Sequence, residues 1–386
     1  MELAQILREG MNRGASDFHL KPKQHAVLRV QGKLMPIDSW PPIETKDLDQ
    51  MAQAMMTSAQ RDRYEREGGV DVQYSVAGVG RFRASICKAR GSTSIALRTV
   101  PYELPSFEDL NLPPVIAKLA MEPRGLVLVT GPAGSGKTTT LAAMIHHMNQ
   151  LRNDHIVTIE DPIEYLHQDK NCIITQREVG TDTPSFADAL RICLRQDPDV
   201  IMVGEMRDVE TIRTVLTLAE TGHLVLSTLH TITAAETVNR IIAEFPGSHE
   251  RQIRGQLSQV LKGIVSQRLI ERADGSGLLP AVEVLVSTST IQRCIEDPAR
   301  TAQIPLAIAE GRDMYGMQTF DQCVLGYYQK GMITYEEALR ASSSPTDVEV
   351  EVQRLSMAAP GAPKPHAAGP SVGPSVGRAA GRPPAR

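Results

Sequence analysis

Residues 131–140 constrain this chain more than any other stretch, because they read GPAGSGKTTT directly after the apolar run 126–129. A strand that ends in such a glycine-rich turn and continues into a helix forms a loop whose backbone N–H groups bind phosphate. The lysine of the motif contacts the β and γ phosphates, and the next hydroxyl ligates Mg²⁺. We therefore expect a site for ATP and Mg²⁺, with Thr138 as a metal ligand. The expected nucleotide-binding residues are Gly131, Pro132, Ala133, Gly134, Ser135, Gly136, Lys137, Thr138 and Thr139.

Further short apolar runs recur along the chain and are separated by segments long enough to be helices. They cover residues 126–129, 156–159, 200–203 and 224–226. Continuous apolar strands that alternate with helices are typical of a parallel sheet covered on both faces. We predict an α/β fold in which such a sheet carries the phosphate loop.

Polar side chains follow these runs, and in parallel sheets the ligand binds at the carboxyl ends of the strands. Glu164 follows the second run, Glu205 the third and His230 the fourth. ATP hydrolysis needs a carboxylate near magnesium and a group that orients the attacking water. We expect Glu205 to serve the metal, through water, or to activate the nucleophile, and His230 to sense the γ phosphate.

Each of these side chains also has a purely structural interpretation, which the pattern alone leaves open. Glu205 follows Gly204 where a common form of this strand ends in Asp-Glu, so a helix-capping role is the alternative. For Glu164 the alternative is a surface carboxylate in a turn that contains proline. Histidines such as His230, or His223 before the same strand, are more often structural than catalytic.

A small α+β unit precedes the phosphate loop. The pattern predicts strands at 26–30, 70–74, 80–86 and 94–100, and helices at 45–56 and 58–67. Because these strands are close in sequence and joined by turns, we expect an antiparallel sheet. Arg81 and Arg83 would share one face of a strand, with Arg98 near the end of the next strand. These arginines either form a solvated sheet face or serve a ligand.

The segment between this unit and the loop is rich in proline. It contains Pro101, Pro105, Pro113, Pro114 and Pro123, which interrupt strands and helices, so we expect a linker at 102–123.

Helices are expected to dominate after residue 233. One buried helical face is predicted from the spacing of Ile253, Leu257, Val260, Leu261, Ile264 and Val265. We place the end of the core at residue 290 and expect further helices at 291–356.

Residues 357–386 consist mainly of Ala, Pro and Gly and carry four basic but no acidic side chains. We expect a disordered tail there, with weak attraction to acidic partners as the functional alternative.

Charge and composition argue against several classes of protein. The net charge of -4 and the pI near 6.2 disfavour a general nucleic-acid binder. No apolar run approaches the ~20 residues that span a bilayer, and the start MELAQILREG lacks the segments of a signal peptide. The five cysteines form no C-x-x-C pair, so we expect a reduced cytoplasmic protein without a zinc site.

Taken together, the motifs resemble the secretion ATPases, and within them the type IV pilus retraction ATPases of twitching motility (PilT and PilU types). The resemblance covers residues 14–339. It rests on GPAGSGKTTT, on TIEDPIEY at 158–165, on RQDPDVIMVGEMRD at 195–208 and on TGHLVLSTLHT at 221–231. It implies a PAS-like domain at 1–101 and a RecA-like ATPase core at 124–290.

The same resemblance implies roles for individual residues. Glu164 and Glu205 correspond to the catalytic carboxylates, and the Gly204-Glu205 strand end is the family's own form. His223 and His230 correspond to site residues, and Arg195 to a further site arginine. Arg83 and Arg98 resemble the arginines that reach a nucleotide across a subunit boundary.

Assembly and partners are likewise implied by the resemblance. It indicates a homo-oligomer, a hexameric ring, which acts on an inner-membrane pilus platform protein and associates with the inner membrane peripherally through the pilus machine. A paralogous pilus ATPase is a further partner, and no nucleic acid is expected.

Extension and type II secretion ATPases are also similar but typically carry a four-cysteine module, which these cysteines do not form. The retraction family's AIRNLIRE-like segment is replaced near Ile291 by IQRCIEDPART. A main motor and an accessory paralogue therefore both stay open.

Overall fold

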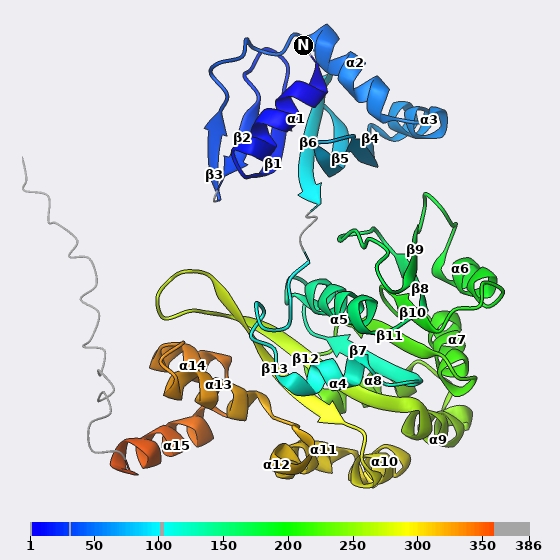
Figure 1. Cartoon of the computed structure of the whole chain (residues 1–386), viewed down its shortest axis with the longest axis vertical. Helices are drawn as coiled ribbons and strands as arrows, with labels where there is room; N and C mark the ends of the chain where they lie inside the picture. Colours follow the sequence, from blue (N-terminus) through cyan, green and yellow to red (C-terminus); the bar gives the residue numbers. More distant parts are fainter. Residues whose placement is uncertain (1, 31, 101–103, 359–386) are drawn as a thin grey trace, which may run out of the picture.

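The computed structural model describes residues 2–30, 32–100 and 104–358. In this part of the chain an N-terminal unit lies at one end, a larger sheet with its helices forms the centre, and further helices lie at the other end (Figure 1). Each unit has its own hydrophobic core, because buried side chains cluster separately in the N-terminal sheet and around the central sheet.

The N-terminal unit is built on an antiparallel sheet with the strand order β3-β2-β1-β6-β5-β4, which confirms the predicted arrangement. Its strands are β1 (Ala15–Leu20), β2 (Val27–Val30), β3 (Lys33–Pro36), β4 (Gly69–Val76), β5 (Gly80–Ala89) and β6 (Ser92–Val100). Its helices are α1 (Leu3–Asn12), α2 (Thr45–Met55) and α3 (Ser58–Glu67). Phe18 and Phe82 meet edge to face at 5.6 Å between ring centroids in its core. The pattern missed β1 and β3, and all four residues of β3 are exposed, so that strand shows no alternation.

The central sheet has the strand order β13-β12-β7-β11-β10-β8-β9 and is parallel from β12 to β9, while β13 pairs antiparallel to β12. Its strands are β7 (Gly125–Thr130), β8 (His155–Glu160), β9 (Ile173–Glu178), β10 (Val200–Val203), β11 (Leu224–Leu229), β12 (Leu261–Glu271) and β13 (Leu278–Val286). The predicted parallel α/β core is therefore confirmed. Strands β9, β12 and β13 were not predicted.

Helices cover both faces of this sheet, which is why its strands are apolar on both sides. One face packs against α4 (Pro114–Ala120) and α5 (Lys137–Leu151). The other face packs against α6 (Phe186–Cys193), α7 (Val209–Glu220), α8 (Ala234–Ala243) and α9 (Glu250–Val260). Along β7, Leu126 and Leu128 belong to one core and Val127 and Val129 to the other.

The predicted helical face at 253–265 is wrong in its second half. Helix α9 ends at Val260, and Leu261 begins the long strand β12. Leu261, Ile264 and Val265 are buried between β7 and β13. A strand buried on both faces shows a continuous apolar run, and periodicity alone does not separate such a run from a buried helix.

The segment at 102–123 contains a helix, which the prolines did not predict. Helix α4 begins with Pro114 itself, at the first helical position, where the missing N–H costs nothing. Val115, Ile116 and Leu119 are buried in the core of the central unit. The segment after Ser106 is thus part of that unit, and Pro101 lies outside the described residues.

The C-terminal part packs against the β12–β13 hairpin. It comprises α10 (Ser289–Glu296), α11 (Ile304–Glu310), α12 (Arg312–Tyr315), α13 (Phe320–Gln329), α14 (Tyr335–Ala341) and α15 (Pro345–Ala358), with a short 3-10 turn at Pro298–Gln303. A second 3-10 turn, at Gly247–His249, precedes α9 in the central unit. Ile270 and Leu279 of the hairpin share a core with Phe320 and Val324 of α13. The predicted tail begins at 357, inside α15, and its residues 359–386 lie outside the described residues. Within the described ranges, no helix is long and apolar enough to cross a membrane.

Candidate nucleotide-binding site

The phosphate loop has the geometry that its sequence predicts. Strand β7 ends at Thr130 and α5 begins at Lys137. Gly131, Gly134 and Gly136 have φ values of 143°, 76° and 86°, which side-chain-bearing residues rarely adopt. A Cβ on Gly131 would also lie 2.2 Å from the carbonyl oxygen of Gln267 on β12. Glycine at this position is therefore required by conformation and by space.

Lys137 and Ser135 give the loop unused capacity to donate hydrogen bonds. The Lys137 ammonium donates to the carbonyl oxygens of Gly131 at 2.9 Å and Pro132 at 3.0 Å. Burial lowers the pKa of Lys137, while the Glu205 and Glu164 carboxylates act in the opposite direction. The Ser135 hydroxyl is buried without a hydrogen-bond partner in the described part of the chain. A buried ammonium and an unpaired hydroxyl beside a helix N-terminus fit a phosphate anion.

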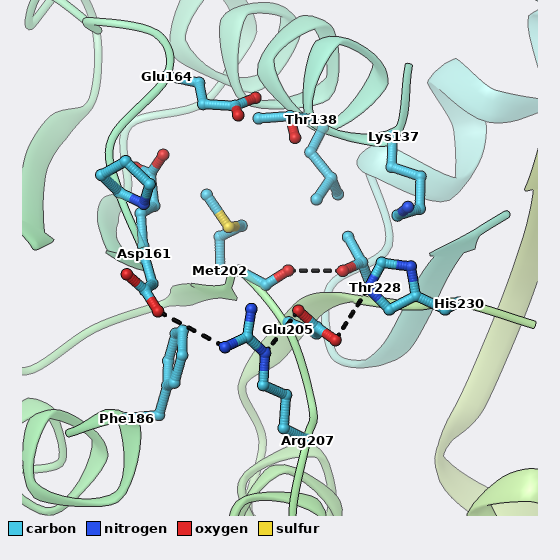
Figure 2. Close-up of a pocket in the computed structure, with 14 residues that line it drawn as sticks. Lys137, Thr138, Asp161, Glu164, Phe186, Met202, Glu205, Arg207, Thr228 and His230 are labelled. Atoms are coloured by element: carbon cyan, nitrogen blue, oxygen red, sulfur yellow. Dashed lines mark hydrogen bonds and ion pairs between the residues drawn. The ribbon is translucent and has the colours of Figure 1, made fainter. Parts of the chain in front are cut away.

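Beside the loop lies a cavity of about 160 Å³ at the carboxyl ends of β7, β8, β10 and β11. Figure 2 shows Lys137, Thr138 and Glu164 along one side of it, and Glu205 with His230 and Arg207 along the other. Thr139 is not among the residues that line this cavity, and its hydroxyl lies 3.0 Å from the Tyr165 hydroxyl. Side chains from separate segments therefore meet where the parallel sheet positions a ligand.

Glu205 is at the centre of an ion-pair network. Its Oε1 lies 3.0 Å from His230 Nε2, and its Oε2 accepts from Arg207 Nε at 2.8 Å. The hydrogen bond to Glu205 raises the pKa of Arg207, and Arg207 also lies 3.7 Å from Asp161. The capping alternative for Glu205 does not hold, since Asp208 is the residue that caps α7 by accepting from the backbone N–H of Thr211.

Glu164 lies in the loop after β8, where Arg83 of the N-terminal sheet reaches it. The distance from Arg83 Nη1 to Glu164 Oε1 is 3.4 Å, and the two side chains are 40% and 43% exposed. Arg98 is directly opposite Arg83 in the β5–β6 register but is 72% exposed and pairs with Asp17 at 2.8 Å. Within one chain, Arg83 thus contacts a candidate carboxylate and Arg98 does not.

Two residues implied by the resemblance lie away from this cavity. His223 precedes β11 at its amino end, so it is about 20 Å along the strand from His230. Its Nδ1 lies 3.0 Å from the Leu218 carbonyl oxygen. Arg195 is exposed between α6 and β10, again at the amino end of a strand. Within one chain neither residue lies in the cavity that His230 lines, and the roles implied for both by the resemblance stay predictions.

Magnesium fits the donor set beside the loop. The Thr138 hydroxyl and the Glu205 carboxylate both line the cavity. Mg²⁺ commonly keeps several waters and takes only one or two protein oxygens besides the substrate phosphates. The described ranges contain no cluster of three metal-ligating side chains, and such a cluster is not required for this type of site.

Gln267 of β12 is a site residue that the sequence did not reveal. Its Nε2 donates to the Ser135 carbonyl oxygen at 2.8 Å, and its Oε1 accepts from the Thr140 hydroxyl at 2.8 Å. The side chain is 3% exposed, and from a neighbouring strand it connects the last part of the phosphate loop to the first turn of α5. The sequence around Gln267 contains no motif for this role. Because the preceding residues were predicted to be helical, the closeness of this strand to the phosphate loop was not apparent.

Replacing Gln267 by leucine should loosen this loop. The change leaves the Ser135 carbonyl and the Thr140 hydroxyl buried without partners, so we expect a loss of about 3 kcal/mol in unfolding free energy and about tenfold weaker ADP binding. Thermal denaturation and titration with a fluorescent ADP measure the two effects. Gln252→Leu, at an exposed position of α9, is the matched control. Unchanged ADP affinity in Gln267→Leu would contradict a role in the loop.

Comparisons with known proteins agree with this geometry. The family described as type II/IV secretion system protein matches residues 2–312. The type IV pilus retractation ATPase PilT of Pseudomonas aeruginosa is 42% identical over 345 residues, which are 89% of this chain and 99% of that protein. The type IV pilus ATPase PilU of the same organism is 39% identical over 353 residues, 92% of each. A crystal structure of the pilus retraction motor PilT with bound ADP has a TM-score of 0.84 and 44% identity, over 91% of this chain and 99% of that one.

Proposed function

Because the chain belongs to the type II/IV secretion system protein family, as its motifs predict, we propose that it is a motor ATPase that drives type IV pilus retraction in twitching motility. The observation that carries this proposal is the near end-to-end match to the retraction motor, in sequence and in fold. ADP bound in that structure supports a nucleotide site formed by the phosphate loop of this chain.

The chain's own residues account for hydrolysis as follows. The backbone N–H groups of 131–136 and the Lys137 ammonium bind the β and γ phosphates, where Lys137 exchanges its present carbonyl partners for phosphate oxygens. The Thr138 hydroxyl and Glu205 would hold Mg²⁺, which would neutralise phosphate charge. Glu164, across the cavity, orients the attacking water. His230 pairs with Glu205 and lines the same cavity, where it would sense the γ phosphate.

The proposed assembly is a hexameric ring in the cytoplasm, attached peripherally to the inner membrane through a pilus platform protein. In such a ring each site borders a neighbouring subunit. Arg83 and Arg98 lie opposite one another on the N-terminal sheet and are both exposed enough to meet a neighbour. A neighbour that donates an arginine completes the charge on the leaving phosphates, which the strand ends of one subunit supply only in part.

An accessory role is the second candidate function. The segment IQRCIEDPART, which replaces the retraction family's characteristic sequence, spans α10 and the turn that follows it. The identity to PilU, 39% against 42% to PilT, is too close to separate the two types. In this role the chain binds ATP and couples a paralogous motor, and hydrolyses little on its own.

Purified protein and a deletion strain distinguish these functions. We expect steady-state ATP hydrolysis by the protein alone, and restored twitching when it is expressed in a piliated bacterium that lacks its retraction ATPase. ADP affinity without turnover, with hydrolysis only beside a co-expressed paralogue, would favour the accessory role. Restored piliation of a strain that lacks its extension ATPase, without restored twitching in the strain that lacks its retraction ATPase, would overturn both.

A further inference from the structure

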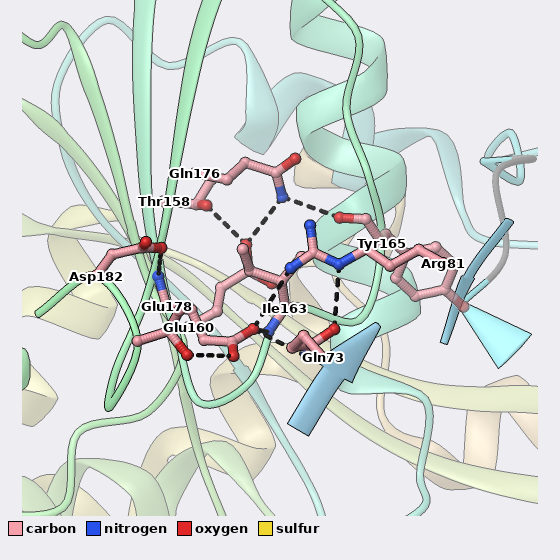
Figure 3. A network of polar contacts seen from close by, with 10 residues as sticks. Gln73, Arg81, Thr158, Glu160, Ile163, Tyr165, Gln176, Glu178 and Asp182 are labelled. Carbon is pink, nitrogen blue, oxygen red and sulfur yellow. Dashed lines mark hydrogen bonds and ion pairs between the residues drawn. The ribbon is translucent and has the colours of Figure 1, made fainter. Parts of the chain in front are cut away.

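The loop that carries Glu164 is attached to the side chains of β9. Gln176 donates from Nε2 to the Tyr165 carbonyl oxygen at 2.9 Å and accepts at Oε1 from the His167 N–H at 2.8 Å (Figure 3). The same amide also donates to Glu160 at 3.1 Å. Glu160 is buried, so its carboxyl group takes part in the network away from bulk water, and this burial raises its pKa. Gln176 therefore fixes the loop on the C-terminal side of Glu164.

Glu178, two residues further along β9, fixes the loop on the other side. Its Oε2 accepts from the backbone N–H of Ile163, the residue directly before Glu164, at 3.1 Å. Its Oε1 accepts from the Thr181 hydroxyl at 3.1 Å. The carboxylate is only 5% exposed. Since residues two apart on a strand share a face, Gln176 and Glu178 hold the loop from the same side of the sheet.

The N-terminal unit contacts the same oxygen atom. Gln73 of β4 donates from Nε2 to Glu178 Oε2 at 2.9 Å, and Arg81 of β5 lies 3.8 Å from it. Arg81 in turn donates from Nε to Gln73 Oε1 at 3.1 Å. Figure 3 shows both side chains approaching from the N-terminal strands towards the β9 carboxylate. One buried carboxylate oxygen is thus shared between the Glu164 loop and the other unit.

We propose that Glu178 is a positioning residue that makes the placement of Glu164 depend on the position of the N-terminal unit. A buried carboxylate is stable only while it is paired and hydrogen-bonded. When the two units separate, Glu178 loses Gln73 and Arg81, and it has to turn towards water or the loop, which moves Ile163. When they close, the carboxylate is held in place and the loop with it. This inference rests on the proposed ATPase activity.

Hydrogen exchange tests the contact without using activity. Arg81→Ala and Gln73→Ala change only the N-terminal unit, yet each should accelerate amide exchange at 161–167 by about tenfold, because the first removes an ion pair with the Glu178 carboxylate and the second removes a hydrogen bond to it. Arg63→Ala is the control, since Arg63 lies in the same unit and pairs with Glu67. Exchange at 161–167 that is unchanged in both variants would overturn the proposal.

Kinetics separate positioning from a general structural effect. In Arg81→Ala we expect kcat to fall about tenfold while KM for ATP stays within about twofold, and Arg81→Lys to recover part of the loss. Glu178→Gln, which keeps an acceptor for Ile163 but not the charge, should lower kcat similarly. The double variant Arg81→Ala/Glu178→Gln should be no slower than Glu178→Gln alone. Effects that multiply would show that Arg81 does not act through Glu178.

Loss of the proposed activity and loss of the role of Glu178 give different experimental results. A parent protein that does not hydrolyse ATP would refute the proposed activity, whatever the exchange data show. A parent that hydrolyses ATP, together with multiplicative effects or unchanged exchange, would refute only the role of Glu178.

Discussion

Replacing Lys137 by alanine is expected to lower ATP turnover by about three orders of magnitude, because it removes the charge that stabilises the transferring phosphoryl group. In the structure the ammonium is buried and bound to two loop carbonyls, so it is already placed where the phosphates enter. Glu205→Ala should have an effect of similar size, since it removes the carboxylate that pairs with His230 and that we propose as a metal ligand. Steady-state phosphate release measures both.

Stability measurements separate this loss from unfolding. Burial already disfavours the Lys137 charge, so the nucleotide-free Lys137→Ala protein should melt close to the parent. ADP at a hundred times its Kd should stabilise the parent by about 2.7 kcal/mol and the variant by much less. Lys118→Ala, at an exposed position of α4, is the control for loss of a lysine. Near-parent turnover in both Lys137→Ala and Glu205→Ala would refute the enzyme assignment.

The accuracy of the sequence-based predictions followed the kind of signal behind each element. The phosphate loop and the strands at 156–159 and 200–203 were predictable, because a fixed motif and short apolar runs between helices have one common structural solution. Strand β12 was not, since its apolar residues continue the helical spacing of α9. Helix α4 was missed because Pro114 was taken as an interruption, although proline starts helices well.

In the candidate site, the sequence identified residues that directly follow a strand. It missed residues that contact a loop from the neighbouring strand. Glu205 and His230 lie at the carboxyl ends of neighbouring strands, which strand order alone brings together. Gln267 and Glu178 reach the loops from β12 and β9, and only the sheet order β12-β7 and β8-β9 shows that proximity. His223 and Arg195 belong to the same motifs but lie at the amino ends of their strands, a difference that the motif alone does not show.

Arg83→Ala is expected to cut turnover by about 10³-fold with the fold intact, as loss of other arginine fingers does. The residue is part of the N-terminal sheet, more than eighty positions from Glu164 in sequence, and yet its guanidinium lies 3.4 Å from that carboxylate. A mere surface arginine would change stability by only about 0.5 kcal/mol and turnover not at all. Arg66→Ala, at an exposed arginine of the same unit, provides that comparison.

Arg83 contacts Glu164 within one chain and is also predicted to contact a neighbouring subunit. The two contacts predict different activities for rings that mix variant subunits. If Arg83 serves its own subunit through Glu164, a subunit that lacks it stays inactive whatever its neighbours are. If Arg83 serves the neighbour, a subunit with intact Lys137 recovers activity beside a subunit with intact Arg83. Arg98, exposed and opposite Arg83, should follow the same rule if it acts across the boundary.

Mixed rings of Arg83→Ala and Lys137→Ala subunits decide between these contacts. Each variant alone should be inactive, and donation to a neighbour predicts recovery that rises to a maximum near equal proportions and depends on ring formation. Light scattering and mass spectrometry establish that the rings are mixed. Verified mixed rings without recovery at any ratio would favour the contact to Glu164 of the same chain. Arg83→Ala rings that hydrolyse ATP at the parent rate would remove both roles, because neither contact then limits the reaction.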